Sequence, residues 1–312
     1  MDRITNTKKD SYNIFQDKKY VVLFAVIAMF SWGCAYPFIK MGMKEFHIVN
    51  NDFGGKILFA GVRFTCAGII TIIISKIRGN SIAVKKWNYF WWLILFGFIN
   101  TGLHYFCFYI GLSNCIGSKS SIIDALGTFW LIILACIIFH EKMTLRKVIG
   151  CILGFSGIVI SNIGMDFSDK FSFSGEGMLI ASTFCAAFGG IITRIVAKKV
   201  NAFTATGYSL LSGGIMLWIV GLLSGGKLTN FTVKGAFVLL GLVVISVVGF
   251  VLYNQLLSYN PVGEIAIFNS LIPVFGTLMS CVLLGEKFYI KYVFSMLIIA
   301  MGIYIINRKS DK

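Results

Sequence analysis

The feature that most constrains this chain is the length of its apolar runs. Several approach or exceed the roughly 20 residues that an α-helix needs to cross a hydrocarbon layer of about 30 Å. Of the 312 residues, 57% are hydrophobic and only 13% charged. A membrane β-barrel is disfavoured, because its strands would appear as segments of about 10 residues that alternate in polarity. We therefore predict an all-α integral membrane protein with ten transmembrane helices. The predicted spans lie near residues 20–41, 57–75, 88–111, 117–139, 146–164, 174–196, 204–223, 235–256, 261–284 and 289–307.

The distribution of charge predicts the orientation of these spans. The net charge is +15, and most of the 28 basic residues fall in the tails and in alternate loops on one side. An excess of Lys and Arg marks the cytoplasmic side, so residues 1–19 and 308–312 are predicted to be cytoplasmic tails of a multi-pass protein of the cytoplasmic membrane. Because topology accounts for the charge, we expect membrane lipid as a partner and no nucleic acid.

The second half of the chain repeats the first. Residues 124–162 align with 269–307 at an offset of 145, and the matched pairs are Glu141 with Glu286, Lys142 with Lys287, Gly157 with Gly302 and Asn162 with Asn307. Just upstream, Asn114 and Gly117 match Asn260 and Gly263 at an offset of 146. The chain is thus predicted to hold a first repeat at 20–164 and a second at 174–307. Five spans is an odd number, so the second repeat is inverted in the membrane, as recurs in transporters.

Short motifs add a family resemblance. Trp32-Gly33 in the first span is followed by Lys40, and Arg63-Phe64 lies in the second span. The fourth and ninth spans both end in Glu-Lys, and Pro273 lies within LIPVFGTLMSCVLLGEK. Together with the number and order of the spans, these motifs resemble the drug/metabolite transporter superfamily, specifically its EamA-type ten-helix branch. The resemblance implies inverted five-helix repeats and transport of small organic solutes, commonly export of amino acids or other metabolites.

Three ionisable residues are predicted to share one level in the outer third of the membrane. At 1.5 Å per residue, Arg63 and His104 lie roughly 9 Å from the external ends of their helices, and Asp124 lies roughly 10 Å from its own. Ionisable groups within a span usually face the bundle interior or an aqueous cavity. In a functional interpretation, Asp124 and Arg63 bind the two charges of a zwitterionic solute, and Asp124 or His104 accepts a coupling proton. In a structural interpretation, Arg63 pairs with Asp124 or extends to the interface, and His104 bonds to a neighbouring helix.

Further residues complete the predicted site. Asn269 matches Asp124 in the repeat, Trp32 and Asn100 lie near the midplane, and Tyr36, Tyr105 and Tyr109 lie in the outer half. Each could contact the solute, and each could instead only pack within the bundle. Pro273 and Gly127 are candidate positions for gating or a helix break, because proline frees backbone carbonyls near the midplane and Gly127-Thr128 occupies the matching place in the first repeat.

Other features are interpreted as structural. Glu141 and Glu286 are predicted on opposite sides of the membrane, so we expect them to end helices and order loops rather than form one active site. Gly150, Gly154 and Gly157 form a small-residue face that permits close helix contact, either within the chain or in a homodimer. The eight cysteines show no C-x-x-C spacing and no Cys/His cluster, so no metal site and no cofactor are predicted.

The predicted function is secondary transport of a small organic metabolite by alternating access, with export of an amino acid as the leading hypothesis. The sequence contains no P-loop, so a gradient or an exchange partner would supply the energy. The alternative within this class is an importer of a vitamin, a sugar or a choline-like cation, for which aromatic residues would form a cage. An intramembrane enzyme is the alternative from another class. We predict no enzyme, because the acids are isolated and there are only three histidines.

Overall fold

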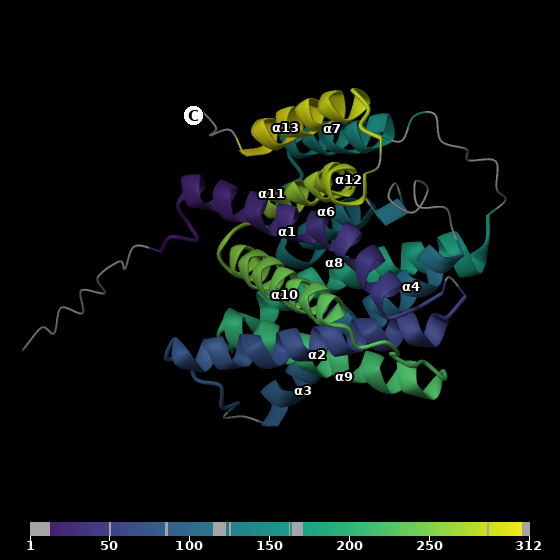
Figure 1. Cartoon of the computed structure of the whole chain (residues 1–312). Coiled ribbons are helices and arrows are strands. Elements are labelled where there is room, and N and C mark those ends of the chain that lie inside the picture. Colours follow the sequence, from purple (N-terminus) through teal and green to yellow (C-terminus); the bar gives the residue numbers. More distant parts are fainter. Residues whose placement is uncertain are drawn as a thin grey trace, which may run out of the picture.

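The computed structural model describes residues 13–49, 51–84, 87–114, 123–124, 126–161, 163, 171–285 and 287–307, and the regular structure in this part of the chain is helical. The helices, shown in Figure 1, are α1 (Lys18–Glu45), α2 (Phe53–Ile77), α3 (Trp87–Gly97), α4 (His104–Ser113), α6 (Leu126–Phe139), α7 (Leu145–Ser161), α8 (Met178–Val196), α9 (Ala202–Leu223), α10 (Val233–Tyr259), α11 (Val262–Ala266), α12 (Leu271–Leu284) and α13 (Lys291–Asn307). Two π-helical segments, η1 (Phe98–Leu103) and η2 (Phe173–Gly177), and one 3-10 turn, η3 (Ile267–Ser270), adjoin them.

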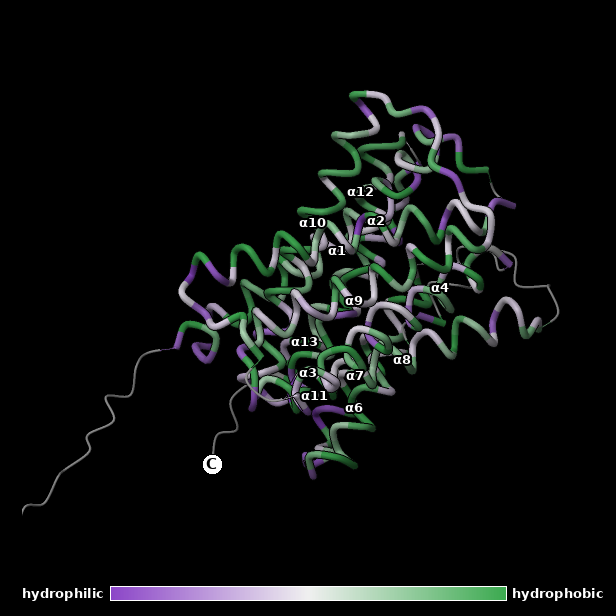
Figure 2. Tube along the Cα trace, turned by 90° about the horizontal axis from the view of Figure 1, so that it is seen from below, coloured by the Kyte–Doolittle hydropathy of each residue, from purple (hydrophilic) through white to green (hydrophobic). Residues whose placement is uncertain are grey.

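These helices confirm the predicted membrane architecture. Within the described residues, seven helical segments are long and apolar enough to cross a membrane, and shorter apolar helices lie at Leu126–Phe139 and Lys291–Ile306. Apolar residues run along the helices, and hydrophilic residues gather mainly at their ends (Figure 2). Large apolar side chains also face outward, such as Leu223 at 84% and Phe237 at 69% exposure. Such a surface is a liability in water and suits contact with lipid.

The helix α2 packs against α9, its counterpart in the second repeat, and the two run antiparallel. Gly61 lies against the backbone of Trp218, and Gly68 lies against that of Leu211. A shift of 146 residues converts these contacts into Gly207 with Ile72 and Gly214 with Thr65, and both are present. Small residues let the two backbones approach closely. The interface is therefore symmetric, and the antiparallel course of two matching helices shows that the repeats are inverted.

The helices α7 and α13 form a second contact of the same kind. Gly157 lies against Ile299, and the Ser295 hydroxyl donates to the Gly157 carbonyl at 2.6 Å. At the other end of the contact, Gly150 lies against Ile306. The glycine face expected on the fifth span is thus buried within the chain. The remaining packing follows the same symmetry, since α1 packs on α10 and α12 while α8 packs on α4 and α6.

The described chain begins and ends at one end of the bundle, here called the terminal end (Figure 1). The Asn260 side chain, just after α10, donates to the Phe15 carbonyl at 2.8 Å, which places the end of α10 there as well. The opposite end, called the far end, holds the contact between the end of α1 and the start of α10. There the Lys234 ammonium lies 2.6 Å from the Glu45 carboxylate.

Two spans depart from regular α-helix, the third near its middle and the ninth in its first half. The third widens into η1 between α3 and α4, and the ninth tightens into η3 between α11 and α12. Pro273, the third residue of α12, has no N–H to donate to the carbonyl of Asn269, so the irregular turn precedes it. Gly127 and Thr128 instead lie within the continuous α6. Glu286, Asn162 and the tail residues 1–12 and 308–312 lie outside the described residues.

Candidate functional site

Asp124 lies in a part of the bundle lined by tyrosines. It belongs to the helical residues 123–124 just before α6, and Tyr36 of α1 and Tyr105 of α4 lie within electrostatic range of it. All three side chains are half-buried. Among the described residues, Asp124 has neither a cationic partner nor a hydrogen bond. This region, here called the polar level, therefore contains a carboxylate whose charge no described side chain neutralises.

Arg63 lies within electrostatic range of Tyr105, as Asp124 does, but its guanidinium is engaged in a contact between helices. Its side chain is 2% exposed, and its Nε donates to the Ser246 hydroxyl of α10 at 2.7 Å. Its guanidinium carbon lies 4.8 Å from the centroid of the Phe64 ring. Within the described part of the chain, no ion pair joins Arg63 to Asp124. Arg63 therefore packs in the contact between α2 and α10 instead of pairing with Asp124 or extending to the interface.

The internal symmetry accounts for this position. A shift of 146 residues places Arg63 on Ser209 and Asn100 on Ser246. In the second contact, Ser209 lies 3.4 Å from the amide nitrogen of Asn100 and 3.4 Å from the Thr101 hydroxyl. The hydrogen bond between α2 and α10 thus has a counterpart between α9 and η1. Arg63 occupies a helix-packing position that both repeats use.

Asn100 and His104 lie one turn apart but have different surroundings. The Asn100 side chain is 8% exposed and lies against Gly189 of α8, so it is enclosed by η1, α8 and α9. His104 is half-buried, and its ring lies 4.4 Å from that of Tyr105. Its Nδ1 lies 3.3 Å from the Asn100 carbonyl of the same helix. His104 therefore adjoins the polar level, whereas the Asn100 amide lies in the contacts of η1 with α8 and α9.

Trp32 and Asn269 both contact Tyr253, a residue that was not predicted from the sequence. The Trp32 ring lies 5.0 Å from that of Tyr253, and the Asn269 amide donates to the Tyr253 hydroxyl at 3.0 Å. The indole nitrogen points at Gly249 of α10 and, with the Asn269 oxygen, lacks a hydrogen-bond partner among the described residues. The three side chains form a tier one helical turn from Tyr36, toward the terminal end.

A sequence signal for this tier was available. Tyr253, Asn254 and Gln255 are three consecutive polar residues within α10, a helix of 27 residues. Asn254 is 3% exposed and donates to the Thr206 hydroxyl of α9 at 3.0 Å. Three consecutive polar residues inside a span indicate interior contacts, even where no single one is charged.

Glu141 is the most densely hydrogen-bonded carboxylate at the terminal end of the described chain. Its Oε1 accepts from the Arg194 guanidinium at 2.6 Å and from the Val262 N–H at 2.8 Å. Its Oε2 accepts from the Lys147 ammonium at 3.0 Å and from the Gly263 N–H at 3.2 Å. Burial opposes ionisation, but the hydrogen bonds from Lys147 and the two N–H groups hold the pKa of this carboxyl below its ordinary value.

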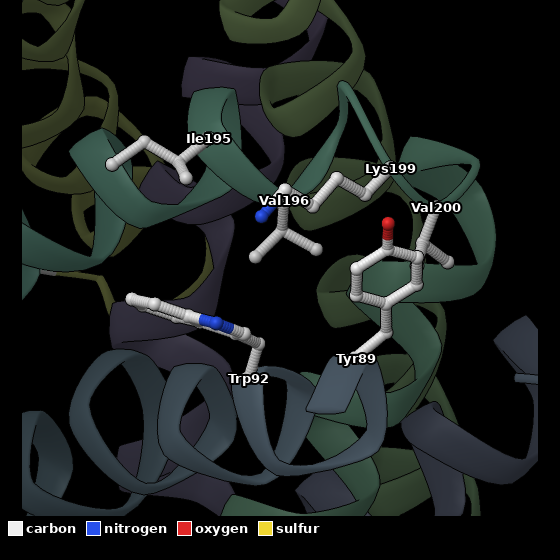
Figure 3. A pocket seen from close by; sticks show the side chains of 6 residues that line it. All are labelled: Tyr89, Trp92, Ile195, Val196, Lys199 and Val200. Carbon is white, nitrogen blue, oxygen red and sulfur yellow. The ribbon is translucent and has the colours of Figure 1, made fainter. Parts of the chain in front are cut away.

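Two hollows at the terminal end lie apart from Asp124. Figure 3 shows the smaller, between α3 and the end of α8, where Lys199 lies 5.4 Å from the Tyr89 ring centroid. Its volume of about 10 Å³ is room for about one water. A polar cleft of about 300 Å³ is lined by Asn13, Ile14, Phe15, Arg78, Asn80, Asn201, Phe203, Gln255 and Tyr259. Neither hollow includes a residue of the predicted site.

The fold is an inverted repeat of apolar helices around a partly buried polar level. This arrangement fits the class of multi-pass membrane transporters. The EamA-like transporter family model matches residues 19–163 and 173–308, one match for each repeat. The chain belongs to this family, and the resemblance found in the sequence is confirmed.

Relatives support the class without naming a cargo. An uncharacterized transporter of Archaeoglobus fulgidus is 24% identical over 292 residues, covering 94% of this chain and 99% of its own. The uncharacterized transporter YvbV of Bacillus subtilis is 24% identical over 297 residues, covering 94% and 93%. A protein crystal structure superposes with a TM-score of 0.73 at 15% identity, covering 90% of this chain and 95% of that one. This last likeness concerns the fold alone.

Proposed function

We propose that this protein is a secondary transporter that moves a small organic amine by alternating access, with Asp124 binding the positively charged nitrogen. The observation that carries the proposal is the half-buried Asp124 carboxylate, which has no cationic partner among the described residues. A buried carboxylate is costly without a counter-charge. A solute ammonium would supply that charge, and the neighbouring rings of Tyr36 and Tyr105 would add cation–π attraction.

The surroundings of Arg63 favour an amine over a zwitterionic amino acid. In the amino-acid hypothesis, Arg63 would bind the solute carboxylate. Its guanidinium is instead 2% exposed, hydrogen-bonded to Ser246 and in contact with Phe64. The choline-like cation considered from the sequence needs only Asp124 and the aromatic rings. We therefore place organic cations ahead of amino acids, and keep amino acids as the competing cargo.

The test is a transport assay with matched solutes. Purified full-length protein in proteoliposomes would be given amino acids, the amines that lack only their carboxylates, a quaternary ammonium and a neutral sugar. We expect uptake or counterflow of the amines, its loss in Asp124→Asn, and its retention in Glu45→Gln, which alters an acid at the far end. Preference for the amino acids that disappears in Arg63→Gln would support the zwitterion hypothesis. Sugar transport that is unaffected by Asp124→Asn would contradict both.

Further parts of the proposal concern orientation and energy. We propose that the terminal end is cytoplasmic, because Lys18, Lys76, Arg78 and Lys198 gather there, and that net flux is export coupled to a proton or to exchange. Labelling of single cysteines from each side would test the orientation. Efflux from preloaded vesicles with and without a pH gradient would test the coupling. Chemically unchanged solute after transport would exclude the enzyme alternative.

A further inference from the structure

Glu141 joins the two repeats at the terminal end. It follows α6 of the first repeat, after His140, whose φ of 53° ends the helix and reverses the chain. One arm of its contacts, to Lys147 of α7, stays within the first repeat. The others reach the second repeat, at Arg194 near the end of α8 and at the N–H groups that begin α11. One carboxylate thus contacts α7, the end of α8 and the start of α11, which are far apart in the sequence.

These contacts are largely shielded from solvent. The Glu141 side chain is 11% exposed, that of Lys147 10% and that of Arg194 25%. The Arg194 guanidinium also lies 4.8 Å from the Phe139 ring centroid, so the cation is held from two directions. Charge-assisted hydrogen bonds in such a setting are short and strong. Separation of the repeats at this end would leave these charges without their partners.

The space between Glu141 and the polar level is filled by apolar side chains. Gly190 of α8 lies against Leu131 of α6 and Leu257 of α10, and both leucines are almost fully buried. Ala135, one turn beyond Leu131 toward Glu141, is 0% exposed. A solute at Asp124 could leave through the terminal end only if α6, α8 and α10 moved apart.

We propose that Glu141 is a latch, a side chain that holds the terminal end closed by tying the first repeat to α8 and α11 and that must release before a solute can pass there. This assignment replaces helix termination as the main role expected from the sequence. It rests on the proposed alternating-access transport, since a latch has a purpose only if the end it closes also opens. Latch release would expose the apolar plug formed by Leu131, Ala135 and Leu257.

The experiment measures opening directly, without a solute. In full-length protein with the eight native cysteines replaced, Ala135→Cys would report on access to the plug from the terminal end. A membrane-impermeant maleimide would be added to protein in nanodiscs, and the rate of labelling measured. We expect Glu141→Gln to raise that rate about tenfold or more, because it removes a charge that holds two cations. Glu45→Gln, which breaks the ion pair at the far end, should leave the rate unchanged.

A second variant protects the test against misfolding. Should Glu141→Gln fail to give a monodisperse protein, Arg194→Gln removes the α8 arm alone and should still accelerate labelling. Unchanged labelling in a folded, transporting variant would overturn the latch. Faster labelling in a protein that transports no tested amine would leave the latch standing and reject the proposed cargo. The two proposals therefore fail in distinguishable ways.

Discussion

The fourth span has a carboxylate at each end, Asp124 and Glu141, and the two differ in their hydrogen bonding. Glu141 accepts four hydrogen bonds, two of them from cationic side chains. Asp124 accepts none from the described residues, although it also lies inside the bundle. A carboxylate that the protein itself satisfies holds structure together. One that the protein leaves unsatisfied can take a ligand as its partner, and this difference distinguishes the proposed latch from the proposed binding residue.

The largest effect is expected from removal of the unsatisfied charge. Asp124→Asn keeps the size of the side chain but cannot pair with an ammonium. Hydrogen bonds to a charged group contribute about 1.5–3 kcal/mol, so amine transport at low concentration should fall roughly 10- to 100-fold. Initial rates in proteoliposomes measure this. A thermal midpoint as high as that of the parent would show that the loss concerns binding, and an unchanged rate would remove Asp124 from the site.

A smaller loss, in stability, is expected when the satisfied carboxylate is changed. Glu141→Gln leaves Lys147 and Arg194 without their counter-charge in a poorly hydrated setting. We expect the free energy of unfolding to fall by about 1–3 kcal/mol, measured by denaturant titration in micelles. The exposed neighbour provides the control, since Lys142→Gln should change it by less than about 0.5 kcal/mol. Equal losses in both variants would mean that the four hydrogen bonds contribute little.

Arg63 is the third residue in this comparison. From the sequence it was expected either to pair with Asp124 or to bind the opposite charge of the same solute. Arg63→Lys keeps the charge but loses the Nε donor that contacts Ser246. We expect about 1 kcal/mol less stability and an unchanged preference for amines over amino acids. Thermal unfolding and competition uptake measure the two. A shift in cargo preference would return Arg63 to the binding site.

The smallest effect is the response of the latch to pH. Burial disfavours the Glu141 anion, but its hydrogen bonds lower the pKa of the folded state below the ordinary value of about 4.3. Its stabilisation is therefore complete above that ordinary value and is lost only as pH falls through the lower folded pKa. The stability difference between parent and Glu141→Gln should stay constant from about pH 8 to pH 5 and shrink in stronger acid. A decline near pH 6 would contradict this.

The sequence predicted the spans well because a bilayer demands long apolar helices whatever their neighbours are. It also revealed the duplication, through Glu-Lys, glycine and asparagine matches. It could not tell which faces meet, because lipid-facing and interior residues of a span are both apolar. The partner of Arg63 depends on Ser246 of another helix, and no local pattern predicts that choice. Glu141 was expected to order a loop, yet its partners lie as far away as Val262 and Gly263.

The interface between α2 and α9 affects how the sequences of the two repeats can diverge. Because it joins matching helices, it is a contact of one sequence with its own copy, like the interface of a twofold homodimer. In a homodimer of two separate copies, every substitution would appear on both sides of the interface, and the new residue would have to be compatible with the same change in the partner. In a single duplicated chain, each position changes once. The same freedom extends to the neighbouring contacts, where one copy carries Arg63 of α2 opposite Ser246 of α10 and the other keeps Ser209 of α9 opposite Asn100 of η1.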